Sequence, residues 1–210
     1  MMDKKNKIYQ THKKIKEAIS ARKKVILWKL SGRPVPPPHI VKQKIIKGYA
    51  ERCKLNTFIE TGTFMGEMID AVLHTFSRII SVEVDQSLAE RAQKKFSADS
   101  HVTIIRGDSS NVLPAIVADI KESCLFWLDA HYSGGVTGKS NIETPIIEEL
   151  NILFNHSAFN HVILIDDARE FTGDNNYPTI AEVRDLVTDR CPDCIVCVKD
   201  DIIRIHRSDI

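Results

Sequence analysis

The sequence predicts an α/β domain with a doubly wound, mostly parallel Rossmann-like sheet that ends in an antiparallel hairpin. Short apolar runs alternate with amphipathic helical segments along most of the chain. Near-continuous apolar strands between helices are typical of a parallel sheet covered on both faces. Two final apolar runs flank Lys199-Asp200-Asp201, a turn typical of a hairpin. With 210 residues, of which 43% are hydrophobic and 27% charged, the chain suits one globular domain.

Each expected strand is a run rich in β-branched and aromatic residues, and each expected helix repeats its apolar residues every three to four positions. The expected strands cover residues 57–61, 78–84, 101–107, 124–129 and 161–167, followed by the hairpin over 194–207. The expected helices cover 39–53, 64–76, 86–96, 110–122, a segment that begins at Thr144-Pro145, and 179–190. Thr144 is expected to cap its helix, because threonine suits an N-cap and proline the first turn.

Residues 1–34 are expected to form a basic amphipathic arm with a proline-rich linker, ahead of a domain over residues 35–210. Residues 1–47 carry a net charge of +12, and the remainder of the chain carries −11. One apolar helical stripe of the arm consists of Ile8, Ile15, Ile19, Ile26 and Leu30. The segment SGRPVPPPH then ends the helix. The stripe suits packing on this domain or on a second copy in a homodimer, and the basic helix also suits an anionic membrane surface or polyanion.

The chain is expected to be cytoplasmic, and peripheral to a membrane if the arm binds one. The N-terminal MMDKKNKIYQ leads into further lysines rather than a signal-peptide core, and no run approaches the length of a membrane span. Five cysteines, an odd number, indicate reduced thiols rather than a disulfide framework. CPDCIVC also suits zinc, but a loop before a strand is favoured because only Cys53 and Cys124 remain to complete a site.

Acidic residues follow all five expected parallel strands. They are Glu60, Glu83 with Asp85, Asp108, Asp129, and Asp166 with Asp167. The carboxyl ends of the strands in a doubly wound sheet meet at one edge, which is where such folds bind their ligands. We therefore predict one acidic site at this edge.

The segment ETGTFMG after the first strand has the glycines of a ligand-binding turn. Gly62 and Gly66 permit a tight turn and close approach of a ligand to the backbone. Glu83 lies 21 residues after Gly62, near the spacing at which a carboxylate binds ribose hydroxyls. The turn lacks the G-x-G-x-x-G that seats a pyrophosphate, and Glu60 favours a cationic ligand instead. An NAD-linked oxidoreductase is therefore disfavoured.

Together these segments resemble the class I S-adenosylmethionine-dependent methyltransferases, closest to the small-molecule O-methyltransferases of the catechol and macrocin type. ETGTFMG resembles the first motif of the family, and SVEVD its ribose-binding strand end. RGDSSNVLP resembles the segment that lines the adenine, and FWLDAHY the fourth-strand motif beside the transferred methyl. The resemblance covers residues 38–207 and leaves the basic arm outside.

The resemblance implies a role for each residue of these motifs in binding S-adenosylmethionine. Glu60 would lie near the methionine ammonium, and Glu83 would bind both ribose hydroxyls. Asp108 and Ser109 would border the adenine, although Ser109 is equally suited to cap a helix. Asp129 would lie beside the methyl group or contact the cofactor. The turn beneath the cofactor would comprise Thr61, Gly62, Thr63 and Gly66.

Methyl transfer to a hydroxyl requires an oriented acceptor and a base. His131, which follows the fourth strand beside Asp129, is the expected base, with His161 and His206 as competitors.

Asp129, Asp166 and Asp167 are also expected to crowd together and to hold Mg²⁺ or another divalent cation. The resemblance implies magnesium at these strand ends, although Asp167 stands where catechol enzymes have an amide. Asp166 also suits capping of the following turn.

The loops SGGVTGKSN and FTGDNNYP are expected to form the acceptor pocket, the first as a mobile loop and the second as a wall, with Arg169 reaching inward. Their polarity favours a small metabolite, sugar or glycan, and Lys139 or Arg169 suits a phosphorylated one. Nucleic acid is disfavoured, because the arm lacks interleaved aromatic residues and the domain is acidic. The expected function is O-methylation, and the alternative is a non-catalytic binding or scaffold protein of the same fold.

Overall fold

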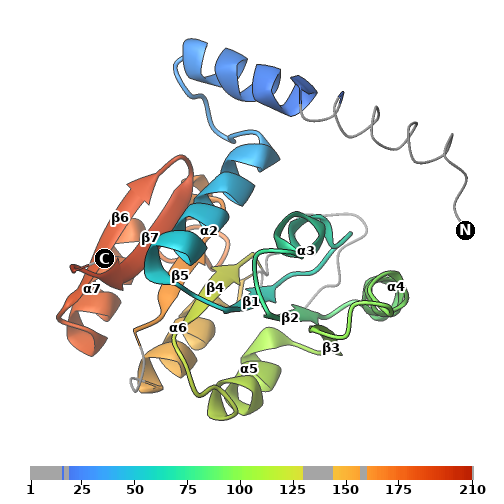
Figure 1. Ribbon diagram of the computed structural model, residues 1–210. Helices are drawn as coiled ribbons and strands as arrows, with labels where there is room; N and C mark the ends of the chain where they lie inside the picture. The colour runs from blue at the N-terminus through green and yellow to red at the C-terminus, as the bar shows by residue number, and fades with distance from the viewer. Residues whose placement is uncertain (1–15, 17–18, 130–143, 157–159, 210) are drawn as a thin grey trace, which may run out of the picture.

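The structure, a computed structural model, describes residue 16 and residues 19–129, 144–156 and 160–209 (Figure 1). In this part of the chain seven strands form one sheet with the order β3-β2-β1-β4-β5-β7-β6. The first five strands are parallel, and β7 runs antiparallel to both β5 and β6. The strands are β1 (Thr57–Thr61), β2 (Arg78–Glu83), β3 (Val102–Arg106), β4 (Cys124–Leu128), β5 (Val162–Ile165), β6 (Cys194–Lys199) and β7 (Ile202–Arg207). The predicted fold class is confirmed.

The helices follow the predicted order, with two differences that matter for the site. They are α2 (His39–Cys53), α3 (Glu67–Val72), α4 (Gln86–Lys95), α5 (Ser109–Ala118), α6 (Ile146–Asn155), the 3₁₀ turn η1 (Ala168–Glu170) and α7 (Ile180–Arg190). Helix α3 starts later than predicted because Phe64 and Gly66 have positive φ angles of 45° and 67°. Helix α6 begins after Pro145 without a side-chain cap, so the prediction that Thr144 caps it is wrong.

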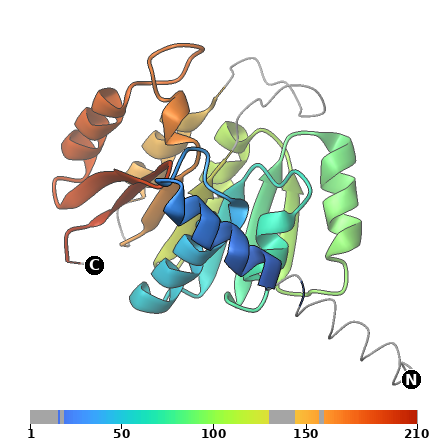
Figure 2. The same ribbon diagram turned by 90° about the horizontal axis from the view of Figure 1, so that it is seen from above.

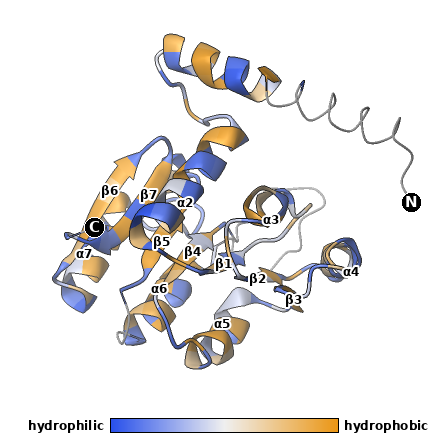
Figure 3. Ribbon diagram, viewed as in Figure 1, coloured by the Kyte–Doolittle hydropathy of each residue, from blue (hydrophilic) through white to orange (hydrophobic). Residues whose placement is uncertain are grey.

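Helices cover both faces of the sheet, as a parallel sheet requires. On one face, alternate strand residues such as Ile59 and Phe126 pack against apolar residues of α5, α6 and α7. On the other, Phe58 and Trp127 pack against α2 and α3. Figure 3 shows hydrophobic and hydrophilic residues mixed along the helices, as expected of helices that pack one face on a sheet. The two cores therefore fix β1 and β4 rigidly in the middle of the sheet, and with them the residues that follow these strands.

The arm is helical over residues 19–30, and this helix lies beyond α2 from the sheet (Figures 1 and 2). Val25 and Trp28 pack against Val41 of α2. The described members of the predicted stripe face outward instead, with Ile19, Ile26 and Leu30 exposed by 52%, 48% and 79%. In the described part the stripe therefore does not pack on this domain. No helix in the described ranges is long and apolar enough to cross a membrane.

The cysteine prediction is wrong for one pair. Cys191, which follows α7, and Cys194, the first residue of β6, form a disulfide. The tight turn between helix and strand brings their Cα atoms to 5.3 Å, within the usual disulfide range. Cys53, Cys124 and Cys197 are free. The paired sulfurs of CPDCIVC are bonded to one another rather than arranged as zinc ligands.

Candidate active site

The acids that end the parallel strands gather at one edge of the sheet, as predicted. Strand β1 is central, and its last residue, Thr61, pairs with Val82 of β2 and Leu128 of β4. The hydrogen bonding continues past the strands, because Asp129 N donates to Thr61 O at 3.0 Å and Asp166 N donates to Leu128 O at 3.0 Å. Glu83 is the last residue of β2. The parallel register therefore places these carboxyl groups side by side.

The loop after β1 bends sharply over the end of β2. Gly62 has a φ of 91° and its N–H donates to Val82 O at 2.9 Å. A Cβ on Gly66 would lie 2.7 Å from a ring carbon of Phe96, so glycine is required by space as well as by conformation. Phe64, within this loop, is 50% exposed. The turn therefore brings its backbone close to Glu83.

Glu83 is held rigidly by backbone groups. Its Oε2 accepts a hydrogen bond from Phe64 N at 2.7 Å, and its Oε1 accepts one from Asp85 N at 3.0 Å. The residue is 6% exposed. Each carboxylate oxygen has a second lone pair, so two further donors can be bound. This geometry suits a ligand with two adjacent hydroxyl groups.

Glu60 is almost completely buried beside the first loop. Ser81 Oγ donates to its Oε1 at 2.7 Å and is itself 2.5 Å from Thr63 Oγ1. Burial raises the pKa of Glu60 to about 8; the Ser81 hydrogen bond opposes this shift, and the charges of Asp129 and Glu83 add to it. Near neutral pH the carboxyl group is therefore mostly protonated until a cationic group approaches it.

Asp108 and Ser109 have different roles at the start of α5. Asp108 is the N-cap, and its Oδ1 accepts from Ser110 N at 3.0 Å and from Ser110 Oγ at 2.7 Å. Ser109 is therefore not the cap, and its buried hydroxyl faces Glu149 of α6. Among the described residues, these hydrogen bonds of Asp108 are those of a helix cap.

Glu149 is a buried acid that the sequence reasoning missed. It is 1% exposed, and its carboxyl group lies close to the Thr61 and Ser109 hydroxyls, although Oε1 and the two hydroxyl oxygens make no well-formed hydrogen bond among the described residues. Burial raises the pKa of Glu149 to about 7, although the Ser109 and Thr61 hydroxyls act in the opposite direction. Buried polar atoms in native proteins are rarely left unpaired, which marks this cluster as functional or hydrated.

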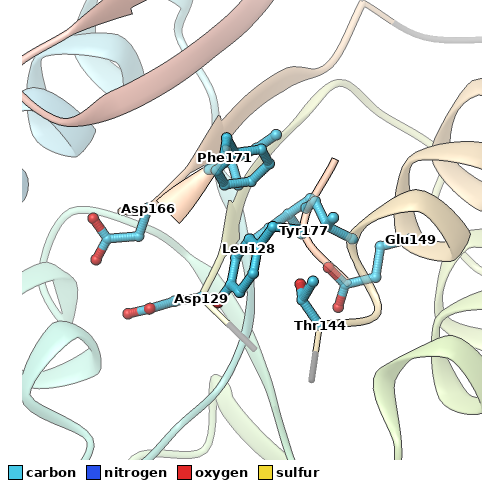
Figure 4. A pocket seen from close by; sticks show the side chains of 9 residues that line it. Leu128, Asp129, Thr144, Glu149, Asp166, Phe171 and Tyr177 are labelled. Atoms are coloured by element: carbon cyan, nitrogen blue, oxygen red, sulfur yellow. The ribbon is translucent and has the colours of Figure 1, made fainter. Parts of the chain in front are cut away.

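A pocket opens between the ends of β4 and β5 (Figure 4). Figure 4 shows the carboxyl groups of Asp129 and Asp166 on one side of it and that of Glu149 on the other. The aromatic residues Phe171 and Tyr177 pack edge to face, with ring centroids 5.4 Å apart. The lining residues are Leu128, Asp129, Thr144, Ile146, Glu149, Ile165, Asp166, Phe171 and Tyr177. Phe171 and Tyr177 of the segment FTGDNNYP thus line this pocket.

The histidines considered as bases lie in different places. His131 is outside the described residues. His161 Nδ1 accepts from the backbone N–H of Cys124, the first residue of β4, and is therefore at the opposite edge of the sheet. His206 lies near the end of β7, which runs antiparallel to β5, and its ring packs on Tyr49 with centroids 5.4 Å apart. Neither competitor reaches the acidic edge.

His39, at the start of α2, is a histidine near the acidic edge that the sequence reasoning missed. Its Nδ1 lies 2.9 Å from Gln43 Nε2 and 3.9 Å from Glu67 Oε2. Burial lowers the pKa of His39, and Asp129 is close enough to act in the opposite direction. No motif distinguishes this histidine, so only the packing of α2 reveals its position.

Lys42 of α2 occupies the centre of the expected metal site. Its Nζ lies 2.5 Å from Asp166 Oδ2 and 3.1 Å from Asp167 Oδ1. Burial lowers the pKa of Lys42, but the two carboxylates outweigh this effect and hold the pKa above its ordinary value. Asp166 Oδ1 also accepts from Asp167 N at 2.8 Å, the turn-capping contact considered above.

Arg169 is held away from the pocket. Its Nη1 lies 2.8 Å from Asp167 Oδ1 and also contacts Asp201. The prediction that Arg169 reaches inward is therefore wrong. With Lys42 and Arg169 both bound to Asp167, the described side chains form no group of three metal ligands, and this arrangement does not fit a divalent ion at Asp166 and Asp167.

Several solved structures share the architecture of this chain. The O-methyltransferase TomG of Streptomyces achromogenes, solved with S-adenosylmethionine, matches with a TM-score of 0.59 at 16% identity, over 89% of this chain and 88% of that one. The Bacillus cereus O-methyltransferase, solved with S-adenosylhomocysteine, matches with 0.60 at 13% identity, over 90% of both chains. The chain has the methyltransferase fold. The adenosylhomocysteine-bound methyltransferase PaMTH1 of Podospora anserina has a TM-score of 0.56 at 16% identity, over 80% of this chain and 78% of that one.

Sequence comparison adds a shorter match to another methyltransferase. No protein family model matches the chain. Ribosomal RNA small subunit methyltransferase A of Bifidobacterium longum is 31% identical over 97 residues, which cover 44% of this chain and 30% of that protein. The match therefore spans less than a third of that methyltransferase. The sequence identities to the solved structures are also low, so these structures establish only the fold of this chain. The methyl acceptor has to be inferred from the residues of the site.

Proposed function

We propose that the chain is an S-adenosylmethionine-dependent methyltransferase that acts on a hydroxyl group of a small metabolite, sugar or glycan. Glu83 carries the proposal, because its carboxylate is fixed by two backbone N–H groups at the end of β2 with lone pairs remaining for two hydroxyls. The solved structures of this fold that contain S-adenosylmethionine or S-adenosylhomocysteine support the same ligand.

The residues of the acidic edge fit this cofactor. Glu83 would accept hydrogen bonds from the ribose, and the turn at Gly62 would let the cofactor approach the backbone closely. Glu60 would ionise when the methionine ammonium lies beside it, since a nearby positive charge lowers the pKa of a buried acid. When bound, S-adenosylmethionine supplies a methyl group on a positively charged sulfur. Asp129, which follows β4, would border that end of the cofactor.

The pocket between β4 and β5 is the proposed acceptor site. Thr144, Glu149 and Tyr177 offer polar groups, and Phe171 offers an apolar wall. Such a mixture suits a small hydroxylated molecule, which needs hydrogen-bond partners as well as apolar contact. The proposed base is His131, which follows Asp129 by two residues in the sequence.

Cofactor binding can be tested by calorimetry with S-adenosylhomocysteine. Glu83→Ala should weaken binding by about 1.5 to 3 kcal/mol, or about 10- to 150-fold, the range for hydrogen bonds to a charged group. Glu90→Ala, at an exposed position on α4, is the matched control and should bind as the wild type does. Unaltered affinity in a folded Glu83→Ala protein would show that the ribose assignment is wrong. A preference for NAD over S-adenosylhomocysteine would favour an oxidoreductase instead.

The acceptor class needs a separate turnover assay. Release of S-adenosylhomocysteine should depend on a hydroxylated metabolite or sugar from a screened panel, and ribosomal RNA should give none. The RNA arm is included because of the short similarity to a ribosomal RNA methyltransferase. Turnover with RNA alone would overturn the small-molecule proposal. Cofactor binding without turnover on any acceptor would favour the scaffold alternative.

A further inference from the structure

An ammonium group lies where three strand-end acids converge. Asp166 and Asp167 follow β5, and Asp129 follows the adjacent β4. Lys42 contacts the first two directly, at 2.5 and 3.1 Å, and lies close enough to Asp129 for an electrostatic interaction. The Lys42 side chain is 11% exposed, so the ion pairs are shielded from solvent. This cluster has a cation within it before any ligand binds.

Helix α2 holds Lys42 in this position. Val41, the preceding residue, packs against Trp28 of the arm helix. Ile46, one helical turn after Lys42 on the same face, is completely buried in the core with Ile69 and Trp127. Swinging the ammonium out of the cluster would leave the buried Asp166 carboxylate without Lys42 as its counter-ion. Asp167 would keep its ion pair with Arg169. Lys42 is therefore a fixed element of the site rather than a mobile surface lysine.

The same oxygens cannot serve a lysine and a divalent ion together. Magnesium, manganese or calcium would need to approach Asp166 and Asp167 to about 2.0–2.6 Å. The ammonium already lies at hydrogen-bond distance from one oxygen of each. A divalent ion on these oxygens would be only a few ångströms from a buried positive charge and would be strongly repelled.

We propose that Lys42 is a built-in replacement for a divalent cation at the ends of β4 and β5, so that the wild-type chain does not take a metal ion at Asp166 and Asp167. Its ammonium neutralises the converging acids and fixes their orientation. Removing the ammonium without removing the acids would then create a divalent-cation site. The proposal depends only on these contacts and stands apart from the proposed methyl transfer.

The test uses Mn²⁺ alone and the full-length protein. Wild type, Lys42→Met and Lys42→Gln are titrated with Mn²⁺, and the free ion is followed by electron paramagnetic resonance. Lys44→Met removes an exposed lysine from the same helix and is the matched control. We expect Lys42→Met and Lys42→Gln to bind one Mn²⁺ per chain at least about tenfold more tightly than wild type and Lys44→Met, with a Mn²⁺-dependent rise in melting temperature.

A second substitution tests whether the Mn²⁺ ion binds at Asp166. Adding Asp166→Asn to Lys42→Met should abolish the gained Mn²⁺ binding, since one ligand oxygen is lost. A folded Lys42→Met protein that binds Mn²⁺ no better than wild type would overturn the proposal. A wild-type site that binds Mn²⁺ and is lost in Asp166→Asn would overturn it as well, and that outcome needs no Lys42 variant to fold. Neither result depends on an acceptor being known.

Discussion

Replacing Glu60 by Gln should remove a pH-dependent penalty from the ligand-free protein. Glu60 is 1% exposed, and burial raises its pKa to about 8 from an ordinary value of 4.5. The folded state therefore holds a proton that the unfolded state releases above about pH 4.5. Glu60 therefore does not reduce the free energy of unfolding below about pH 4.5, and the protein loses stability through Glu60 as the pH rises from there toward 8. Gln does not ionise, and its amide oxygen can still accept from Ser81.

The size of the effect follows from the distance between the two pKa values. A pH of 7 lies about 2.5 units above the pKa of 4.5 that Glu60 has in the unfolded state, and Glu60 stays mostly protonated in the folded state over this range. Each unit is about 1.4 kcal/mol, so burial of Glu60 costs about 3 kcal/mol at neutral pH. Between about pH 5.5 and pH 8 the wild type should lose about 3 kcal/mol relative to Glu60→Gln.

Urea unfolding of both proteins at these two pH values measures the difference directly. Glu90→Gln, at an exposed position, controls for the loss of any carboxyl group and should follow the wild type at both pH values. If the gap between wild type and Glu60→Gln is the same at about pH 5.5 and pH 8, Glu60 titrates as an ordinary acid. The explanation from burial would then be wrong.

Further predictions concern the cofactor, the pocket, the arm and the metal. Binding of S-adenosylhomocysteine should tighten as the pH rises toward 8 in wild type more than in Glu60→Gln, because Glu60 must ionise to meet an ammonium; calorimetry at several pH values checks this. Glu149→Gln should stabilise the ligand-free protein against urea by about 1 kcal/mol or more above pH 7, since burial raises the pKa of Glu149 to about 7. Deleting residues 1–34 should leave cofactor affinity unchanged by calorimetry, since the strand-end acids lie downstream; loss of a dimer in sedimentation or of liposome binding would show what the arm contacts. Once an acceptor is known, turnover should persist in EDTA and disappear in His131→Ala, whereas loss in EDTA would favour a metal.

The sheet could be predicted because each strand carries its own signal. Apolar runs such as Cys124–Leu128 are buried on both faces, so their composition alone identifies them. The convergence of the acids followed from topology, since parallel strands end at one edge. The start of α3 could not be placed, because the apolar pattern continues through Phe64, whose backbone φ of 45° ends any helix there. Sequence periodicity does not report such a turn.

Residues that enter the site from neighbouring helices could not be predicted from the sequence. Glu149 lies in α6, and its acidic neighbour Glu148 has the same character in the sequence. Only the packing of α6 decides that Glu149 is buried at 1% exposure beside Ser109. The direction of a helical side chain depends on which face packs, and a segment with mixed polarity leaves that face open. Strand-end motifs therefore identify the part of the pocket wall that follows β4 and β5, and they miss Ile146 and Glu149, which α6 supplies.

The position of Lys42 in the site likewise could not be predicted from the sequence, and it changes the interpretation of the strand-end acids. It is one of twelve lysines in residues 1–47, a region whose positive charge suggested a polyanion or a membrane surface. One of those charges is instead buried against Asp166 and Asp167. Converging carboxylates at the strand ends repel one another unless a cation or a proton lies between them, and the sequence suggested a divalent ion for this role. A metal was considered because the acids follow two strands that neighbour each other in this fold. Lys42 lies more than a hundred residues away from Asp166 in the chain, and only the packing of α2 on the core brings it there.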